Sequence, residues 1–514
     1  MDQRNPLSAL AGVVSAGLAL ATGEMVSALG PQGQSLVGSV AGEIVDRTPG
    51  SIIHRAIEAL GTNDKPVLLT LIVVVCLTLG AATGVVGLRR PSVVAPTFAL
   101  ASLGGVVAGW RDPLTAHWVV LVAAAAAAVV GTITLRFLLG RVPRSAQAPT
   151  VVVPGAGTGS RRSFLSATAG FGAGAVVLAA AGRALGDRPR ALTGGPAGSP
   201  PPALPEVTAT PVAPVGLDVV GISPLITPTA EFYRIDTAFS YPRVDLGNWR
   251  LRIGGLVDHP VELSYADLAA RAQVEVPITI ACVSNTVGGD LVGTAYWQGI
   301  ELATLLDEAG VQPGGTQIIG RSLDGFTAGF PTEAATDGRS ALLVLGMNGE
   351  PLPVKHGFPA RLVVEGLYGY VSATKWLRSI ELCGWDDVDG YWVPLGWSKE
   401  GPIKLQSRID VPRSGETLVA GPTTIAGVAW APGVGIAAVE VQIDDGPWQQ
   451  ARLGSRFTDA TWRQWMLPWD APEGRHTLRV RATDADGRIQ TSKVTPVEPD
   501  GATGHHTVQV RVTA

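Results

Sequence analysis

A single cysteine, Cys282, follows an apolar β-branched run in the segment VPITIACVSN and precedes the polar, glycine-bearing loop TVGGDLVG. The chain holds only three cysteines. A thiolate serves in proteins as a soft metal ligand or as a nucleophile. The sequence has no CxxC, no CxxCH and no Cys/His set with zinc spacing, so structural zinc and c-type haem lack their usual signals. Metal ligation, nucleophilic attack and a disulfide are therefore the chemical roles open to Cys282.

The other cysteines and one histidine define the alternatives. Cys76 lies in a Val/Leu run, where a small apolar residue suffices for packing. Cys383, in IELCGWDD, follows an expected strand, and a disulfide with Cys282 is one alternative in an oxidising compartment. Another pairs Cys282 as nucleophile with His356 as base, as in a thiol hydrolase or transpeptidase. A non-enzymatic surface binding protein is a further alternative, in which the thiol has no chemical role.

Five apolar stretches near the start of the sequence predict membrane-spanning helices. A mean hydropathy of +0.27 with only 16% charged residues is unusual for a soluble chain of 514 residues. Each stretch approaches or exceeds the roughly 18–20 residues that cross a hydrocarbon core. The stretches are residues 7–29, 66–88, 92–109, 118–139 and 164–182.

The arginines between these stretches predict the topology, because short cytoplasmic loops accumulate Lys and Arg. Arg89 and Arg90 follow the second stretch, and a second group lies between the fourth and the fifth. That second group is Arg136, Arg141, Arg144, Arg161 and Arg162. Both loops are expected in the cytoplasm, which makes the chain a multi-pass protein of the cell membrane with everything after the fifth stretch on the extracytoplasmic side.

The fifth stretch opens with GSRRSFLSATAGFG, which resembles an internal twin-arginine export signal. A twin-arginine route carries folded proteins that already hold a cofactor. The alternative is an ordinary positive flank of a membrane helix. The pair Arg161 and Arg162 fits both interpretations.

The composition divides the chain into a multi-domain architecture. Residues 1–183 form the transmembrane α-helical region, and residues 184–216 are a Pro/Gly-rich linker that cannot bury enough apolar surface to fold. Residues 217–402 mix short strands and helices, which predicts an α+β domain. Alternating strands with Asp-Gly, Pro-Gly and Glu-Gly turns predict an immunoglobulin-like β-sandwich in residues 403–514.

Several blocks in order carry a resemblance to a known family. They are ITIACVSN, GTAYWQGIELATLLDEAGV and ALLVLGMNGEPLPVKHGFPARLVVEGLYGYVSATKWLRSIEL. Together they resemble the molybdopterin domain of the sulfite oxidase family, and the following sandwich resembles that family's dimerisation domain. The resemblance covers residues 217–514 and implies a molybdenum–molybdopterin cofactor (Mo cofactor).

The resemblance assigns roles to individual residues. The cysteine matching Cys282 is the protein's thiolate ligand to molybdenum, and soft sulfur suits such a metal. The segments KHGFPAR and GYVSATKW match pterin-contacting stretches of the family. They imply cofactor contacts from His356, Arg361, Ser372, Thr374 and Lys375.

The sequence also departs from the family pattern near the expected substrate site. Asn285 begins the stretch where sulfite oxidases tend to carry an arginine pair, and Phe326 stands where they have an active-site tyrosine. In EFYRIDTAF, Arg234, Asp236 and Thr237 occupy a further cofactor-contacting stretch. These departures make sulfite itself a doubtful substrate, and they leave Asn285 and Phe326 as candidate residues of the catalytic pocket.

The resemblance implies two-electron oxygen-atom transfer on a small molecule. The electrons then need a separate redox partner, such as a cytochrome or a quinone-linked protein, because the five apolar stretches offer only His117, at the edge of one of them, and no bis-histidine haem site. A homodimer is what the family suggests. A formal net charge of −4 argues against nucleic acid as a partner.

Overall fold

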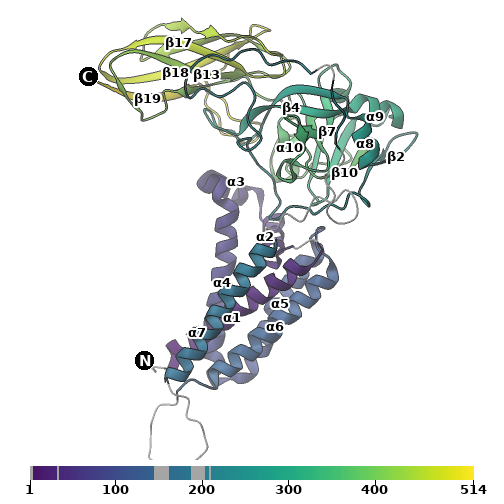
Figure 1. Cartoon of the computed structure of the whole chain (residues 1–514), viewed down its shortest axis with the longest axis vertical. Coiled ribbons are helices and arrows are strands. Elements are labelled where there is room, and N and C mark those ends of the chain that lie inside the picture. Colours follow the sequence, from purple (N-terminus) through teal and green to yellow (C-terminus); the bar gives the residue numbers. More distant parts are fainter. Residues whose placement is uncertain (1–3, 32–33, 144–160, 187–202, 208–209) are drawn as a thin grey trace, which may run out of the picture. The chain divides into compact units, whose positions relative to one another are not determined.

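The computed structural model describes residues 4–31, 34–143, 161–186, 203–207 and 210–514. The chain forms two compact units (Figure 1). The first comprises Met1–Arg190 with the short segment Ala238–Arg243, and the second comprises Ala191–Thr237 with Val244–Ala514. Within the described residues, all the strands lie in the second unit.

Helices make up the first unit. They are α1 (Arg4–Leu29), α2 (Leu36–Arg47), α3 (Gly50–Leu60), α4 (Asp64–Arg89), α5 (Val94–Arg111), α6 (His117–Leu139) and α7 (Arg161–Gly186), with short 3-10 turns η1 (Gly61–Asn63) and η2 (Pro91–Val93). Among the described residues, five helices are long and apolar enough to cross a membrane, and they coincide with the five predicted stretches. Helices α2 and α3 were not predicted, because 12 and 11 residues interrupted by polar side chains are too short to cross a membrane.

Small residues let α1 and α4 approach closely. Helix α1 packs against α4, α6 and α7 (Figure 1). A Cβ at Gly80 would lie 2.5 Å from the Cβ of Ala16, and a Cβ at Gly84 would collide with the Ser8 carbonyl oxygen. Gly80 and Gly84 are four residues apart and so share one face of α4, as in the small-xxx-small pattern of membrane helices.

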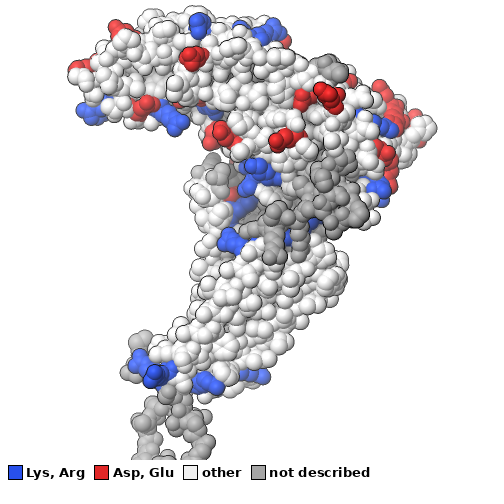
Figure 2. Space-filling model, viewed as in Figure 1, with Lys and Arg blue, Asp and Glu red and all other residues white. Residues whose placement is uncertain are grey.

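Positive charge gathers at one end of the helical unit. The C-terminal ends of α4 and α6 and the N-terminal end of α7 meet there, and each carries arginine. Figure 2 shows this blue cluster and, above it, a broad surface almost without charge. An uncharged belt next to a basic end is the distribution that the positive-inside rule describes.

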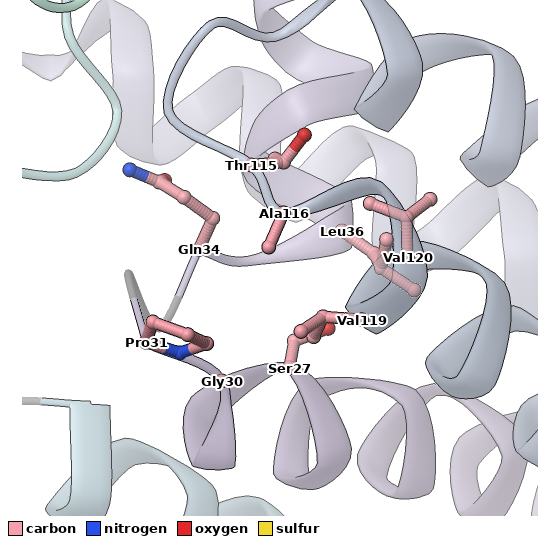
Figure 3. A pocket seen from close by; sticks show the side chains of 9 residues that line it. All are labelled: Ser27, Gly30, Pro31, Gln34, Leu36, Thr115, Ala116, Val119 and Val120. Carbon is pink, nitrogen blue, oxygen red and sulfur yellow. The ribbon is translucent and has the colours of Figure 1, made fainter.

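A small cavity lies where the end of α1, the segment before α2 and the start of α6 meet (Figure 3). It is lined by Ser27, Gly30, Pro31, Gln34, Leu36, Thr115, Ala116, Val119 and Val120. The amide oxygen of Gln34 accepts a hydrogen bond from the hydroxyl of Ser240. The cavity volume of about 10 Å³ suits about one water molecule. It offers no room for a quinone ring.

The α+β region (residues 217–402) contains two five-stranded sheets. The first has the order β2-β1-β10-β5-β6, from β1 (Arg250–Gly255), β2 (Val261–Ser264), β5 (Gln317–Ser322), β6 (Thr327–Pro331) and β10 (Leu377–Cys383). The second has the order β3-β4-β7-β8 with β9 also on β7, from β3 (Val274–Ala281), β4 (Val292–Glu301), β7 (Ala341–Met347), β8 (Glu350–Pro351) and β9 (Arg361–Val364). Short helical segments connect them: α8 (Tyr265–Arg271), α9 (Leu302–Ala309), α10 (Gly369–Ser372), η3 (Thr332–Ala335), η4 (Val354–His356) and η5 (Val393–Leu395).

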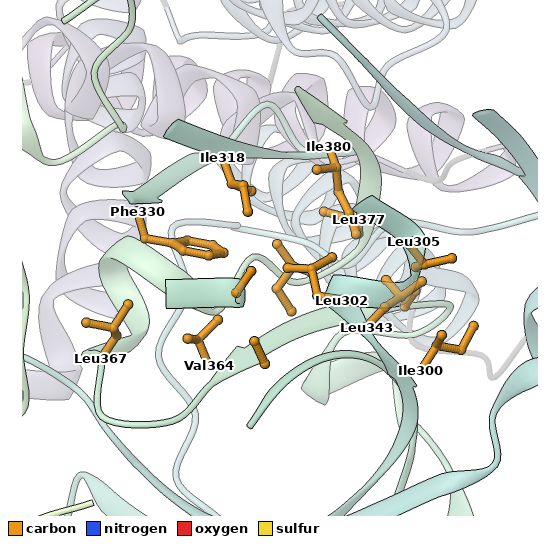
Figure 4. Packing of buried hydrophobic residues seen from close by; sticks show 14 of the residues in the cluster. Ile300, Leu302, Leu305, Ile318, Phe330, Leu343, Val364, Leu367, Leu377 and Ile380 are labelled. Carbon is orange, nitrogen blue, oxygen red and sulfur yellow. The ribbon is translucent and has the colours of Figure 1, made fainter. Parts of the chain in front are cut away.

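Apolar side chains from both sheets and from α9 form one core (Figure 4). Leu305, Ile318 and Leu343 are fully buried in it. Local signals in the sequence define the ends of two of the connecting helices. Ser264 caps α8 in a capping box with Asp267, and Gly310, at φ +67°, ends α9.

The C-terminal β region (residues 403–514) contains two further sheets. One has the order β11-β13-β17-β16, from β11 (Gln406–Val411), β13 (Gly421–Trp430), β16 (Arg452–Leu453) and β17 (Arg463–Ala471). The other has the order β12-β19-β18-β14-β15, from β12 (Thr417–Val419), β14 (Ile436–Ile443), β15 (Trp448–Gln450), β18 (Gly474–Asp484) and β19 (His506–Thr513). Ile425 and Trp465 of one sheet share a core with Val439 and Val508 of the other. The predicted β-sheet content is confirmed, and the immunoglobulin-like topology stays a prediction.

The described end of the predicted linker is held against the second unit. Residues 187–202 and 208–209 of that linker lie outside the described residues. Tyr296 donates its hydroxyl hydrogen to the Pro211 carbonyl at 2.8 Å and accepts the Ala213 N–H at 3.1 Å. The amide of Gln298 donates to the Pro205 carbonyl at 2.8 Å. Proline-rich extended chain leaves carbonyls free to accept such bonds, and here side chains of β4 use them.

Candidate functional site

Strand β3 positions Cys282. Its last residues are fully buried, and it pairs antiparallel with β4 from Val274 to Ala281. The Cys282 N–H donates to the Leu291 carbonyl at 2.9 Å, which closes a loop between the two strands. Cys282 is 8% exposed and is a free thiol, as is Cys383, so the alternative of a disulfide between them is not realised.

Opposing effects act on the thiol. Burial raises the pKa of Cys282, while hydrogen bonds from Ser284 and the positive charge of Lys375 act in the other direction. Ser284 was not predicted, although its position two residues after Cys282 in the same loop was available as a signal. Ser284 and Lys375 therefore favour the thiolate in a buried site that otherwise favours the neutral thiol.

Two predicted cofactor residues meet in an ion pair. Lys375 donates from Nζ to Asp236 Oδ2 at 2.8 Å, and the two side chains are 11% and 7% exposed. Next to Lys375, Trp376 has a positive φ of 50° and is buried. Positive φ is a genuine outlier for a bulky residue. Hydrogen bonds from the Trp376 N–H to Gly357 and from its Nε1 to Val354 hold the conformation.

Arg361 is a buried cation at the start of β9. It is 5% exposed, donates from Nη1 to the His356 carbonyl at 3.1 Å, and lies 5.0 Å from the ring centre of Trp297. Burial lowers the pKa of Arg361 to about 10, with Tyr233 acting in the opposite direction. Within the described residues, no carboxylate pairs with it. A buried cation without a counterion is costly and marks a place for an anionic group.

His356 is neutral, and its ring is hydrogen-bonded to the backbone. It is 2% exposed, and its Nε2 lies 3.1 Å from the Thr229 carbonyl, so Nε2 carries the hydrogen. Burial, followed by the charge of Arg361, lowers the pKa of His356 to about 4. Among the described contacts, none joins His356 to Cys282. The nucleophile–base pair that a thiol hydrolase requires is not formed.

The remaining predicted cofactor residues differ in how exposed their side chains are. Thr374 and Ser372 are buried, and their hydroxyls donate to backbone carbonyls of Gly320 and Tyr368 at 3.5 and 3.0 Å. The side chain of Arg234 is exposed, and that of Thr237 is half-buried. Both therefore lie closer to solvent than Thr374 and Ser372.

The two candidate pocket residues lie on different loops. Asn285 is 3% exposed, and its Oδ1 accepts the Leu291 N–H at 2.9 Å, so its side chain stabilises the loop that follows Cys282. Phe326 is half-buried, with its ring 5.8 Å from that of Tyr391. Asp324 accepts the Phe326 N–H, and burial raises the pKa of this carboxyl group.

Sequence reasoning missed two tyrosines that lie near the thiol. Burial and then the negative charge of Cys282 raise the pKa of Tyr233. Burial also raises the pKa of Tyr368, with the charges of Cys282 and Asp500 contributing further. Tyr233 directly precedes Arg234, and Tyr368 directly precedes the segment GYVSATKW. A single tyrosine in an aromatic-rich segment has no spacing pattern that predicts a function.

Comparisons with known proteins cover the region that contains Cys282. Residues 238–392 match the family described as oxidoreductase molybdopterin binding domain. Human mitochondrial sulfite oxidase is 30% identical over 320 residues, which cover 53% of this chain and 58% of that protein. The uncharacterized oxidoreductase YuiH of Bacillus subtilis (strain 168) is 35% identical over 157 residues, which cover 30% of this chain and 76% of that protein.

One solved structure is similar to part of this chain. The sulfane dehydrogenase SoxCD from Paracoccus pantotrophus covers 56% of this chain and 82% of that chain, at 23% identity and a TM-score of 0.49. The matched domain and the relatives define a molybdopterin-binding oxidoreductase. The chain belongs to the sulfite oxidase family, and this membership implies a molybdenum cofactor.

Proposed function

We propose that this protein is a membrane-anchored oxidoreductase that transfers an oxygen atom to or from a small molecule on the extracytoplasmic side, with the Cys282 thiolate as a ligand to molybdenum. The observation that carries the proposal is that Tyr233 interacts electrostatically with both Cys282, directly after β3, and Arg361, a buried cation to which the described residues supply no carboxylate partner. A thiolate and an unpaired cation together suit a soft metal bound to an anionic organic group.

The residues around Cys282 fit this cofactor. A guanidinium donates to phosphate or to a polar ring edge in fixed directions, which Arg361 can do from its buried position. Lys375 supplies a second positive charge, already oriented by Asp236. His356, with Nε2 bound to Thr229, keeps its other ring nitrogen as an acceptor. When bound, the molybdenum group supplies two-electron redox chemistry and oxygen-atom exchange.

The chain's own residues then bind and orient the substrate. Asn285 and Phe326 occupy the positions where the family resemblance expects an arginine pair and a tyrosine. Neither residue carries a positive charge, and the amide oxygen of Asn285 already accepts a hydrogen bond from the Leu291 N–H. We therefore propose a substrate that is less anionic than sulfite. Tyr233 and Tyr368 supply hydroxyl groups in the vicinity of the thiol instead.

The helical unit supports membrane anchoring and the side of the membrane. Arginines gather at the end where α7 begins, so this end is assigned to the cytoplasm. The second unit follows the opposite end of α7 and is therefore extracytoplasmic. Arg161 and Arg162 suit a twin-arginine signal there. Electrons pass to a separate cytochrome or quinone-linked protein, as the resemblance to the family implies.

The decisive experiment measures molybdenum and released pterin in the full chain, purified from a host that makes the cofactor. We expect about one molybdenum per wild-type chain, and loss or altered spectroscopy of the metal in Cys282→Ser. Cys383→Ser removes a buried thiol outside the site and serves as the matched control. Well-folded wild-type protein that contains neither metal nor pterin would contradict the proposal and would favour a thiol enzyme or a binding protein.

A further inference from the structure

The C-terminal β region contacts the chain on both sides of Cys282. Before the cysteine, Thr279 of β3 donates its N–H to the Ala460 carbonyl at 2.9 Å, and its hydroxyl accepts the Trp462 N–H at 2.7 Å. After the cysteine, Arg408 and His506 contact the loop of residues 283–290. The strand that leads to Cys282 and the loop that leaves it are thus both supported by the same region.

Arg408 contacts the loop through its guanidinium. Nη1 donates to the Gly289 carbonyl, Nη2 to the Ser223 hydroxyl and Nε to Asp410 Oδ1, each at 2.7 Å. Arg408 is 9% exposed, so water does not compete for these bonds. Three acceptors in three directions match the planar donor fork of arginine, which a lysine cannot reproduce.

His506 contacts the loop one residue earlier. Its Nδ1 accepts the Ile409 N–H at 3.0 Å, so the ring is neutral and oriented. The opposite edge of the ring packs on Gly288, where a Cβ would lie 2.8 Å from the ring Cγ and closer still to other ring atoms. Gly288 also has a φ of +78°. Only glycine therefore fits between the loop and the histidine.

The loop can transmit these contacts to the thiol because its ends are joined. The Cys282 N–H bonds to the Leu291 carbonyl, and Asn285 bonds both to the Cys282 carbonyl and to the Leu291 N–H. The loop is a closed and internally bonded turn, so a displacement at Gly288 or Gly289 shifts its other members.

We propose that Arg408 and His506 are positioning residues: from the C-terminal β region they hold the loop of residues 283–290 and thereby fix the place and the accessibility of the Cys282 sulfur. This inference builds on the proposed function only in treating Cys282 as the working thiol. The geometric claim applies with or without a bound metal.

The test is the rate at which iodoacetamide alkylates Cys282 in the full chain, expressed without the pterin cofactor and followed peptide by peptide in a mass spectrometer. We expect alkylation to be about tenfold faster in His506→Ala and in the double variant Arg408→Ala/Asp410→Asn, because the loop opens more often. The second substitution avoids an unpaired buried carboxylate. Arg511→Ala, an exposed arginine of β19, is the matched control and is expected to leave the rate unchanged.

Cys383 distinguishes local opening from unfolding. It is buried and lies outside the loop, so its alkylation rate is expected to stay at the wild-type value in every variant. A variant that unfolds would expose both thiols, and the decision then passes to Gly288→Ala, made alone and together with the milder substitution His506→Gln. In wild type Gly288→Ala is expected to speed Cys282 alkylation, and by a smaller factor when His506 is already glutamine, since the two residues share one contact.

The outcomes separate this inference from the proposed function. Unchanged Cys282 alkylation in folded His506→Ala and double-variant chains would overturn the positioning role, whatever the metal content. Equal effects of Gly288→Ala in both backgrounds would also overturn it for His506. If the variants are alkylated faster, the positioning role is supported. If the wild-type chain from a host that makes the cofactor contains no molybdenum, the cofactor proposal is rejected separately.

Discussion

Arg361 and Arg408 are two buried arginines in the second unit, 5% and 9% exposed, with very different surroundings. Arg408 pairs with Asp410 and satisfies two further acceptors. Arg361 donates to the backbone carbonyls of His356 and Leu362 and lies over Trp297. Arg408 has a carboxylate counterion, whereas among the described residues Arg361 has none. Under the proposed function, Arg408 stabilises the fold and Arg361 contacts an anionic ligand.

The largest expected effect follows from breaking the complete pair. Arg408→Gln leaves Asp410 buried without its partner, which costs roughly 3–5 kcal/mol of unfolding free energy. Urea unfolding of the cofactor-free chain, followed by tryptophan fluorescence, measures this loss. Asp410→Asn in the same chain is expected to recover a large part of it, and no recovery would mean that the ion pair is not the source.

Arg361→Gln is expected to give the opposite pattern. Without cofactor, the unfolding free energy should change by less than about 1 kcal/mol or increase, because an uncompensated buried charge is removed. With cofactor, retention should fall by at least tenfold, as for loss of a charge-assisted bond of about 1.5–3 kcal/mol. Molybdenum and pterin contents after gel filtration measure retention. A large loss of stability in the cofactor-free chain would remove the contrast with Arg408.

Burial lowers the pKa of His356 and of His506 to about 4, and the charge of a neighbouring arginine is the second cause for each. Arg361 acts on His356, and Arg408 acts on His506. The unfolded chain binds a proton near pH 6.5 and the folded chain only near pH 4, so stability is full above pH 6.5 and falls as the pH decreases toward 4. The expected loss at pH 5 is roughly 1–2 kcal/mol per histidine. His506→Gln should remove one share of this dependence in urea unfolding curves.

The cofactor sharpens this comparison further. An anionic group beside Arg361 offsets the charge that disfavours protonation of His356, whereas His506 beside Arg408 is untouched. The acid-induced loss of stability is therefore expected to shrink in the cofactor-bound chain by part of the His356 share only. Unfolding titrations of His506→Gln with and without cofactor isolate this difference, and identical pH profiles would contradict it.

The smallest effect is expected at an exposed pair. Arg252 and Glu262 lie 2.7 Å apart on neighbouring strands, with side chains 66% and 51% exposed. Arg252→Ala should change the unfolding free energy by less than about 0.5 kcal/mol, because water and salt screen the pair. The same urea unfolding experiment measures it and calibrates the scale for the buried arginines.

Local patterns gave the parts of the fold that the sequence predicts well. The length and hydropathy of five runs define the long helices, and Ser264 and Gly310 mark helix ends through their own backbone geometry. The pairing of β1 with β10 joins Arg252 to Ser379 in parallel, across more than a hundred residues. No local signal encodes such a pairing, because it depends on how the whole core packs.

The candidate site likewise has residues that the sequence indicated and contacts that it did not. The family resemblance led to Cys282, Arg361 and Lys375, which the structure gathers in one region. It did not indicate that Asp236 pairs with Lys375 across 139 positions, or that Arg408 contacts Gly289 across 119. These contacts depend on three-dimensional proximity alone.

The support of the Cys282 loop by His506 sets an order of events during synthesis. The ribosome releases the segment around Cys282 long before it reaches residue 506, near the end of the 514-residue chain. Until then, Gly288 has no ring to pack against and Gly289 gains its partner only when Arg408 emerges. If Arg408 and His506 have the proposed positioning role, the thiol site matures only after residue 506 has left the ribosome, and a nascent chain stalled earlier is expected to carry an open, alkylatable cysteine.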